Sequence, residues 1–287
     1  MSSVPPRILP PERPSDERRM SFIEATLWTI GSVVLVVSCW QIVVRAAPAW
    51  KDDAGVSALC QMAAYTVLLL LLRTFYFPKT KVSLVFGTRA GSWVFYPIAI
   101  VLGAAILFPS SAIYEAALAR WPDKAQGSQI LANFHDLPRW RQVTAAVGLV
   151  GTTPLIEECL FRGALFGTLR RHHPVALVVL STASLFALVH VQPQLYLPIG
   201  MVGAAIAFLR VASGSIWPGV LMHMTFNGLS FYAQVTSPGS SEEPTPTWQV
   251  LGGAVVTAGL LALVQHLRSK RGDPEPDLRR PEEEEEP

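Results

Sequence analysis

The central part of the chain carries too little charge to cover a water-soluble surface. Residues 1–24 hold eight of the 44 Asp, Glu, Lys and Arg side chains and residues 267–287 hold thirteen, which leaves 23 for the 242 residues between them. Charged residues make up about 25% of a typical soluble domain. Most of the surface of residues 25–266 must therefore face lipid, and we predict a polytopic membrane protein.

The composition also excludes several classes of protein. The net charge is only +2, and no basic stripe is interleaved with aromatic residues, so we expect no nucleic acid partner. The three cysteines, Cys39, Cys60 and Cys159, lie in apolar stretches without CxxC spacing, which argues against a disulfide framework or a zinc ribbon. No phosphate-binding glycine motif occurs, so the chain by itself is not an ATP-driven pump.

Eight hydrophobic segments lie between the two charged ends of the chain. Backbone groups in lipid must find hydrogen-bond partners within the protein, and the alternating pattern of a β-barrel is absent, so helices are expected. We predict an all-α fold, a membrane bundle of about eight transmembrane helices, at residues 27–47, 57–76, 93–109, 142–169, 174–191, 196–211, 215–233 and 248–267.

Composition sets the expected domain boundaries. Residues 1–24, rich in Pro and Arg, are predicted to be a disordered tail, and so are residues 268–287, which include five consecutive glutamates. Residues 25–267 then form the transmembrane domain. The Lys and Arg residues of the connections place both tails in the cytoplasm, and residues 110–141 would form an external loop whose stretch 114–121 lies on the membrane surface.

Ionisable residues inside a span cost about 2.5–3.5 kcal/mol each on insertion scales, and here they form three clusters. The first cluster follows Pro154, which makes a kink plausible, and contains Glu157, Glu158 and Arg162. Glu158 and Arg162 are four residues apart in the favourable acid-before-base order, so a buried structural ion pair explains them. Glu157 projects about 100° away around the helix and needs a partner of its own.

The other two clusters lie in the fifth and seventh hydrophobic segments. Phe186 and His190 share a helical face, and so do His223 and Asn227. Taken alone, His190 is as compatible with a satisfied polar contact as with catalysis, and His223 with Asn227 could simply hydrogen-bond between helices. Taken together, however, a carboxylate and an imidazole can polarise a water, and a His/Asn pair can donate to an oxyanion. This combination favours amide hydrolysis without a covalent intermediate.

Three motifs occur in order on successive membrane segments: Glu157-Glu158-x-x-x-Arg162, Phe186-x-x-x-His190 and His223-x-x-x-Asn227. In this arrangement the chain resembles the CAAX-processing and bacteriocin-processing (CPBP, or Abi) family of intramembrane glutamic peptidases, which includes the type II CAAX prenyl endopeptidases. The core that carries the motifs covers about residues 142–232.

The resemblance implies a role for each motif residue. Glu157 and His190 would activate the attacking water, and His223 and Asn227 would form the oxyanion hole. The supporting residues would be Glu158 and Arg162, which orient the first motif, and Phe186, which packs beside the site. No cofactor and no metal are implied. A zinc site with two histidines and one glutamate is conceivable from Glu157, His190 and His223, but the sequence has no HExxH pair on one helix.

The expected function is therefore that of a metal-independent, glutamic-type intramembrane endopeptidase. Its partners would be the lipid bilayer and a membrane-anchored protein or peptide precursor, cleaved at a leader segment or at a C-terminal sorting or CAAX-like tail. The Pro-rich and charged tails favour a bacterial inner-membrane protein. The alternative is a non-catalytic membrane protein, such as an immunity or scaffold factor that sequesters a peptide. A transporter is less well supported, because no internal repeat is evident.

Overall fold

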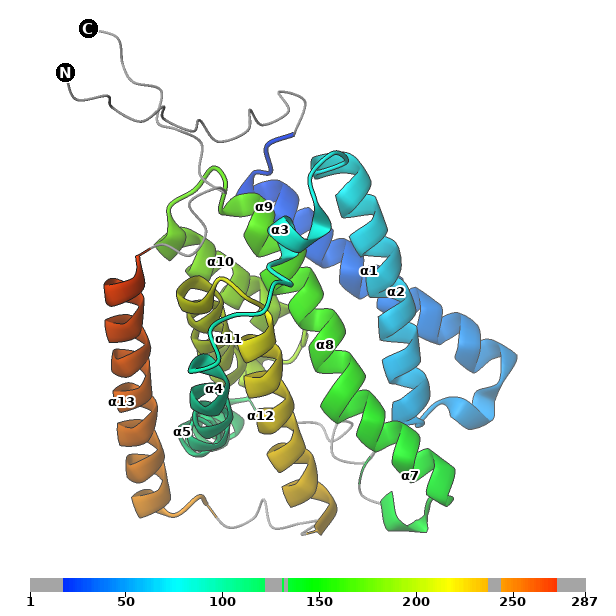
Figure 1. Cartoon of the computed structure of the whole chain (residues 1–287). Coiled ribbons are helices and arrows are strands. Elements are labelled where there is room, and N and C mark those ends of the chain that lie inside the picture. The colour runs from blue at the N-terminus through cyan, green and yellow to red at the C-terminus, as the bar shows by residue number, and fades with distance from the viewer. Residues whose placement is uncertain (1–17, 122–130, 132–133, 237–243, 273–287) are drawn as a thin grey trace, which may run out of the picture.

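The computed structural model of the protein describes residues 18–121, 131, 134–236 and 244–272. Every regular element in these residues is a helix, and no strand occurs among them. The predicted all-α class is therefore confirmed for the described part of the chain. Most of the long helices run side by side and form one bundle (Figure 1).

The helices follow the hydrophobic segments in order. The two short 3₁₀ turns are Pro48–Trp50 and Phe134–Asp136, and two π-helical segments interrupt the helix that begins at Arg139. The α-helices are α1 (Phe22–Ala46), α2 (Ala54–Tyr76), α3 (Val82–Phe86), α4 (Phe95–Ala105), α5 (Leu107–Arg120), α7 (Arg139–Ala146), α8 (Thr153–Glu158), α9 (Phe166–Leu169), α10 (Val175–Leu188), α11 (Pro193–Ser213), α12 (Trp217–Thr236) and α13 (Thr247–Arg271).

Six helical stretches in the described residues are long and apolar enough to cross a membrane, and the chain is an integral membrane protein. The predicted count of eight spans is not reached by this measure, because the helices α10 and α12 do not meet it. The count of eight therefore stays a prediction. The six are Phe22–Ala46, Ala54–Tyr76, Phe95–Arg120, Arg139–Leu169, Pro193–Ser213 and Thr247–Arg271.

The helices differ in how far they are buried. More than half of the apolar window of α11 is buried in the protein, whereas α1 and α13 bury only 11% and 17% of theirs. The two peripheral helices lie on opposite flanks of the bundle (Figure 1). Polar side chains on the inner helices are consequently shielded from lipid by the outer ones.

Helix α10 is too short to cross a bilayer. Its 14 residues span about 21 Å at a rise of about 1.5 Å per residue, against a hydrocarbon core of about 30 Å. The predicted segment 174–191 therefore does not remain helical to its end. The chain turns after Leu188 and enters α11 at Pro193.

Helix α1 begins at Phe22, three residues before the boundary predicted for the transmembrane domain. Ser21 and Glu24 cap it reciprocally: the Ser21 Oγ accepts from the Glu24 amide at 3.2 Å, and the Glu24 Oε2 accepts from the Ser21 amide at 2.8 Å. This capping box satisfies amides that a helix start otherwise leaves unpaired. At the other end α13 continues to Arg271. Residues 1–17 and 273–287 of the predicted tails lie outside the described residues.

The loop expected at residues 110–141 is wrong for its first part. Helix α5 continues to Arg120, and Phe95–Arg120 is long and apolar enough to span the membrane, with a break at Ile106. The predicted hydrophobic segment ended at residue 109, before Ser110 and Ser111. In the structure Ser111 instead returns its hydroxyl to the Leu107 carbonyl at 3.0 Å, a local bond that lets a polar residue stay in a helix.

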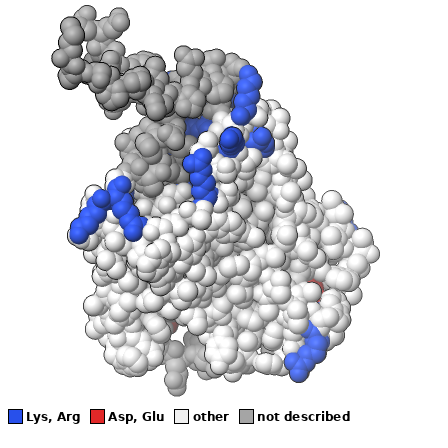
Figure 2. All heavy atoms as spheres, in the orientation of Figure 1, with Lys and Arg blue, Asp and Glu red and all other residues white. Residues whose placement is uncertain are grey.

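Basic side chains gather at one end of the bundle. Figure 2 shows Lys and Arg concentrated at its upper end, with few on the face between the two ends. This end includes Arg73 near the end of α2, Arg170 and Arg171 after α9, and the last turn of α13. Helix α1 begins and α13 ends on the same side (Figure 1).

Candidate active site

The helix that carries the two glutamates is irregular on both sides of them. Residues Val147–Thr152 and Cys159–Leu165 are π-helical, and the short α8 between them contains Pro154, Glu157 and Glu158. Proline lacks an amide hydrogen and cannot continue the regular hydrogen-bond ladder. The segment with Pro154 is thus flanked by π-helical turns, a distortion that is frequent at functional sites, and the kink expected at Pro154 stays a prediction.

Glu158 lies in a fully buried ion pair. Its Oε1 is 3.0 Å from the Arg162 Nη1, and both side chains are completely shielded from solvent. Arg162 also donates from Nη2 to the carbonyl of Gly203 on α11 at 2.7 Å, and its guanidinium lies 4.4 Å above the ring of Phe186. A Cβ at Gly203 would approach that Nη2 to 3.1 Å, so glycine permits this close contact. The expected pairing forms and joins two helices.

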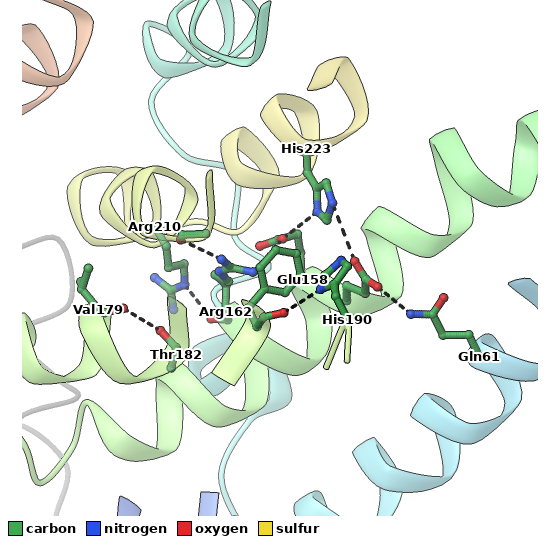
Figure 3. Close-up of polar contacts among 11 residues, drawn as sticks. Gln61, Glu158, Arg162, Val179, Thr182, His190, Arg210 and His223 are labelled. Carbon is green, nitrogen blue, oxygen red and sulfur yellow. Dashed lines mark hydrogen bonds and ion pairs between the residues drawn. The ribbon is translucent and has the colours of Figure 1, made fainter. Parts of the chain in front are cut away.

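His223 reaches both glutamates from α12. Its Nδ1 is 2.9 Å from the Glu158 Oε1, and its Nε2 is 3.7 Å from the Glu157 Oε2 (Figure 3). The side chain is 5% exposed. Since a carboxylate only accepts hydrogen bonds, the Nδ1 of His223 donates to Glu158 when that group is ionised. The imidazole is therefore held with its other nitrogen toward Glu157.

Glu157 borders a cavity in addition to its contact with His223. Its Oε1 accepts a hydrogen bond from the Gln61 Nε2 at 2.6 Å, and its carboxylate borders a pocket of about 290 Å³. Five valines make most of the pocket wall aliphatic: Val33, Val36 and Val37 from α1, and Val189 and Val191 from the turn after α10. The other residues that line it with Glu157 are Gln61 and Tyr65 from α2 and His190. Glu157 and His190 thus border the same space.

His190 does not lie on a helix, contrary to the expectation from the sequence. It stands in the turn after Leu188, and the next residue, Val191, has a φ of 57°, which a β-branched residue rarely adopts. The His190 Nδ1 is 3.0 Å from the Phe186 carbonyl. A carbonyl can only accept, so Nδ1 carries the hydrogen and the Nε2 of the neutral ring is the proton acceptor. This is the tautomer that a general base requires.

Phe186 packs among the charged and polar groups of the site. Its ring is edge-on to Phe161, His190 and His223 at centroid distances of 5.3, 5.4 and 5.5 Å. Edge-to-face packing orients rings and adds to the energy of burial. Phe186 is 1% exposed and also supports Arg162, so it touches both histidines and the cation of the ion pair.

Asn227 lies one turn after His223 on α12, and its hydrogen bond leads to the π-helical segment that precedes the glutamates. Its Nδ2 donates to the carbonyl of Leu149, in the first π-helical segment, at 3.0 Å. A carboxamide nitrogen carries two hydrogens, so the second can serve another acceptor. The structure therefore brings six of the seven predicted residues into mutual contact or a common pocket. Asn227 instead hydrogen-bonds to a backbone carbonyl of the helix that carries the glutamates.

Sequence reasoning missed Gln61, Thr153 and Arg210. Gln61 and Thr153 contact each other beside Glu157, and the fully buried Arg210 donates from Nε to the Arg162 carbonyl at 3.2 Å. The available signal was a lone polar or charged residue in an apolar helix, since such residues usually have a partner in the protein interior. For metal ions, no group of three or more His, Cys, Asp or Glu in the described ranges is arranged to hold one.

The three clusters also lie in a stretch that is similar to a known family. The family model described as type II CAAX prenyl endopeptidase Rce1-like matches residues 139–229. This stretch is Rce1-like. It runs from the start of α7 to Leu229 on α12 and contains all three motifs, so the resemblance drawn from them is confirmed. The match supports a CAAX-type intramembrane protease in general, acting on a protein or peptide in the membrane. Searches of curated proteins and of solved structures gave no match.

Proposed function

We propose that this protein is a glutamic-type intramembrane endopeptidase that cleaves a peptide bond of a membrane-associated precursor with an activated water. The observation that supports this most directly is the convergence of Glu157 and His190 on one pocket inside the bundle. One is a carboxylate that accepts its hydrogen bond from a neutral amide, and the other is an imidazole whose Nε2 is the acceptor in the neutral ring. Both are suited to accept a proton from water.

In the proposed reaction, water attacks the carbonyl carbon of the scissile bond. Glu157, assisted by His190, takes the proton of the water as the C–O bond forms, and the carbonyl oxygen becomes an oxyanion. When the intermediate collapses, the C–N bond breaks and the same pair returns the proton to the leaving amine. One water is consumed for each bond cleaved, and no covalent enzyme intermediate is formed.

His223 and Asn227 are the proposed oxyanion donors. The Nδ1 of His223 is directed at Glu158. Its Nε2 can therefore donate in two cases only: when the ring is an imidazolium, or when a protonated Glu158 donates to Nδ1 and the neutral ring carries its hydrogen on Nε2. Asn227 would contribute the hydrogen of Nδ2 that is not donated to Leu149. Removing one such donor typically costs about 10²–10³-fold in kcat.

The substrate we propose is a leader segment or a C-terminal sorting tail of a bacterial inner-membrane precursor. The basic end of the bundle in Figure 2 supports a cytoplasmic position for that end, because Lys and Arg are enriched on the cytoplasmic side of membrane proteins. Both charged tails would then be cytoplasmic. Prenylated tails are the other substrate class that the family match allows.

The test is cleavage of reporter peptides by purified protein in proteoliposomes. Leader, C-terminal-anchor and prenylated reporters are compared for the wild type, Glu157→Gln and Asp52→Asn, each with and without a metal chelator. Asp52 is an exposed carboxylate between α1 and α2, so its variant controls for loss of a negative charge. We expect cleavage that survives chelation and Asp52→Asn but disappears in Glu157→Gln.

Two results would contradict this proposal. Cleavage retained by Glu157→Gln would exclude Glu157 as the base, and loss of cleavage on chelation would exclude a metal-independent reaction. If a cellular phenotype of the wild type were preserved by Glu157→Gln, the non-catalytic peptide-binding alternative would replace the enzyme.

A further inference from the structure

Gln61 is the residue outside the three motifs that touches the proposed base most closely. It lies in α2, whose 23 residues are mainly apolar, and it borders the pocket together with Glu157 and His190. Its Nε2 is 2.6 Å from the Glu157 Oε1 (Figure 3). From these contacts we infer that Gln61 is a positioning residue, which holds the Glu157 carboxylate in the orientation that water activation requires. This inference rests on the proposed peptidase function.

The contacts of Gln61 determine which way its amide points. An ionised carboxylate can only accept, so the amide nitrogen must face Glu157. The amide oxygen then faces Thr153, whose Oγ1 donates to it at 3.2 Å. Thr153 and Glu157 are both on α8, one helical turn apart. The side chain of Gln61 therefore bridges two successive turns of the helix that carries the base. The carboxylate of Glu157, which only accepts, sets the orientation of the amide, and the Thr153 hydroxyl donates to the amide oxygen in that orientation.

This bridge gives the two carboxylate oxygens of Glu157 different partners. Oε1 is occupied by the Gln61 amide, while Oε2 lies on the side of His223 at 3.7 Å from its Nε2. A glutamate side chain has three rotatable bonds, so without a donor from α2 its carboxylate could swing within the pocket. A neutral donor fixes the orientation and leaves the charge of the carboxylate in place, which a cation at the same point would neutralise.

The arrangement also explains why an amide is needed at this position and why its length matters. Asparagine is shorter by one methylene and would not reach Glu157 from the same backbone position. Leucine has a similar volume but provides no hydrogen bond. If Gln61 acted only by filling space, leucine would replace it without loss; if it acts by positioning, leucine must lower the rate of the chemical step.

The experiment measures kcat and KM for Gln61→Leu in proteoliposomes, on whichever leader, C-terminal-anchor or prenylated reporter the wild type cleaves fastest. We expect kcat to fall by about 10²-fold, since a displacement of a catalytic group by about 1 Å has an effect of that size. KM should stay within about twofold, because a positioning residue does not bind the substrate. A change confined to KM, or a kcat within about threefold of the wild type, would overturn the inference.

Two adjacent threonines provide a matched pair of controls. The Thr153 hydroxyl donates to Gln61, whereas the Thr152 hydroxyl donates to the Gly148 carbonyl of its own helix at 3.3 Å. Thr153→Val should lower kcat by about tenfold and Thr152→Val should not, because only the first loses a contact to the amide. Thr153→Val should have no further effect in Gln61→Leu. Equal effects of the two valine variants, or additive effects of Thr153→Val and Gln61→Leu, would contradict the bridge.

The design separates this inference from the proposed function. If Glu157→Gln is inactive while Gln61→Leu remains fully active, Gln61 has no positioning role and the peptidase assignment stands. If Glu157→Gln itself cleaves the reporter, the proposed function fails first. Thermal unfolding in detergent establishes whether Gln61→Leu is folded; should it not be, the comparison of Thr153→Val with Thr152→Val decides alone.

Discussion

Glu157 and Glu158 are neighbours in the chain, yet they lie in opposite surroundings. Glu158 is completely buried, paired with Arg162 and contacted by His223. Glu157 has a neutral amide as its closest partner and borders a pocket of about 290 Å³. The rotation of about 100° per helical residue directs one carboxylate into the protein interior and the other toward space that a substrate can occupy. The two identical side chains thus differ in surroundings, which fits a structural task for Glu158 and the chemical task that we propose for Glu157.

The sharpest way to test this difference is to neutralise each glutamate separately. Glu157→Gln should lower cleavage by about 10⁴-fold, at the upper end for loss of a general base, with little change in thermal unfolding. Glu158→Gln should instead lower the unfolding temperature, because Arg162 and His223 lose the charge they face. Cleavage of the fastest reporter and thermal unfolding in detergent check both. The comparison breaks down if Glu158→Gln is as stable as the wild type.

Removing the cation of the ion pair should have the next largest effect. Arg162→Met leaves Glu158 buried without its charge partner and removes the bond to the Gly203 carbonyl. Breaking one side of a buried pair typically costs about 3–5 kcal/mol. Denaturant unfolding in detergent measures this loss. The matched change Arg141→Met removes a partly exposed partner of Asp53 and should cost clearly less; equal losses would contradict the role of burial.

His190 borders the pocket together with Glu157. Its replacement should therefore affect the rate of cleavage rather than the stability of the protein. In His190→Asn the side-chain amide can still donate to the Phe186 carbonyl, but the acceptor nitrogen is lost. We expect cleavage to fall by about 10²-fold, with normal unfolding. Full activity of the asparagine variant would show that Glu157 alone suffices as base.

A small substitution where α11 contacts Arg162 should separate effects on stability from effects on activity. In Gly203→Ala the new methyl group would lie 3.0 Å from a ring atom of Phe186 and 3.1 Å from the Arg162 Nη2. We expect a loss of about 1 kcal/mol in stability, as for modest overpacking, and a smaller loss of activity than in His190→Asn. Gly259→Ala on α13, where a Cβ meets nothing within 4 Å, is the control.

Local features of the site could be predicted from the sequence, whereas contacts between distant elements could not. The Glu158–Arg162 pair follows from a spacing of four residues on one helix, and the structure contains it. The position of His190 was mispredicted, because Val189 and Val191 are apolar and give no sign that the helix ends at Leu188. Only Pro193 and the local backbone geometry mark the turn.

The contacts of Gln61 and Asn227 depend on tertiary structure and were beyond the sequence patterns. Gln61 is 96 positions away from Glu157, and nothing in α2 indicates which helix it will face. Asn227 was expected beside the reacting bond, but its amide also meets the Leu149 carbonyl, in a π-helical segment that hydropathy does not reveal. The continuation of the helical chain through α5 to Arg120 was missed although Ser111 satisfies its hydroxyl within the helix.

The shortness of α10 has a consequence for the lipid around the protein. A helix that spans about 21 Å falls about 9 Å short of a hydrocarbon layer of about 30 Å. Lipids relieve such a mismatch by thinning next to the short helix. The thinned region would adjoin the turn that carries His190 and the pocket beside it. Bulk water would thus have a shorter path to the pocket, where the proposed reaction consumes one water molecule for each bond cleaved.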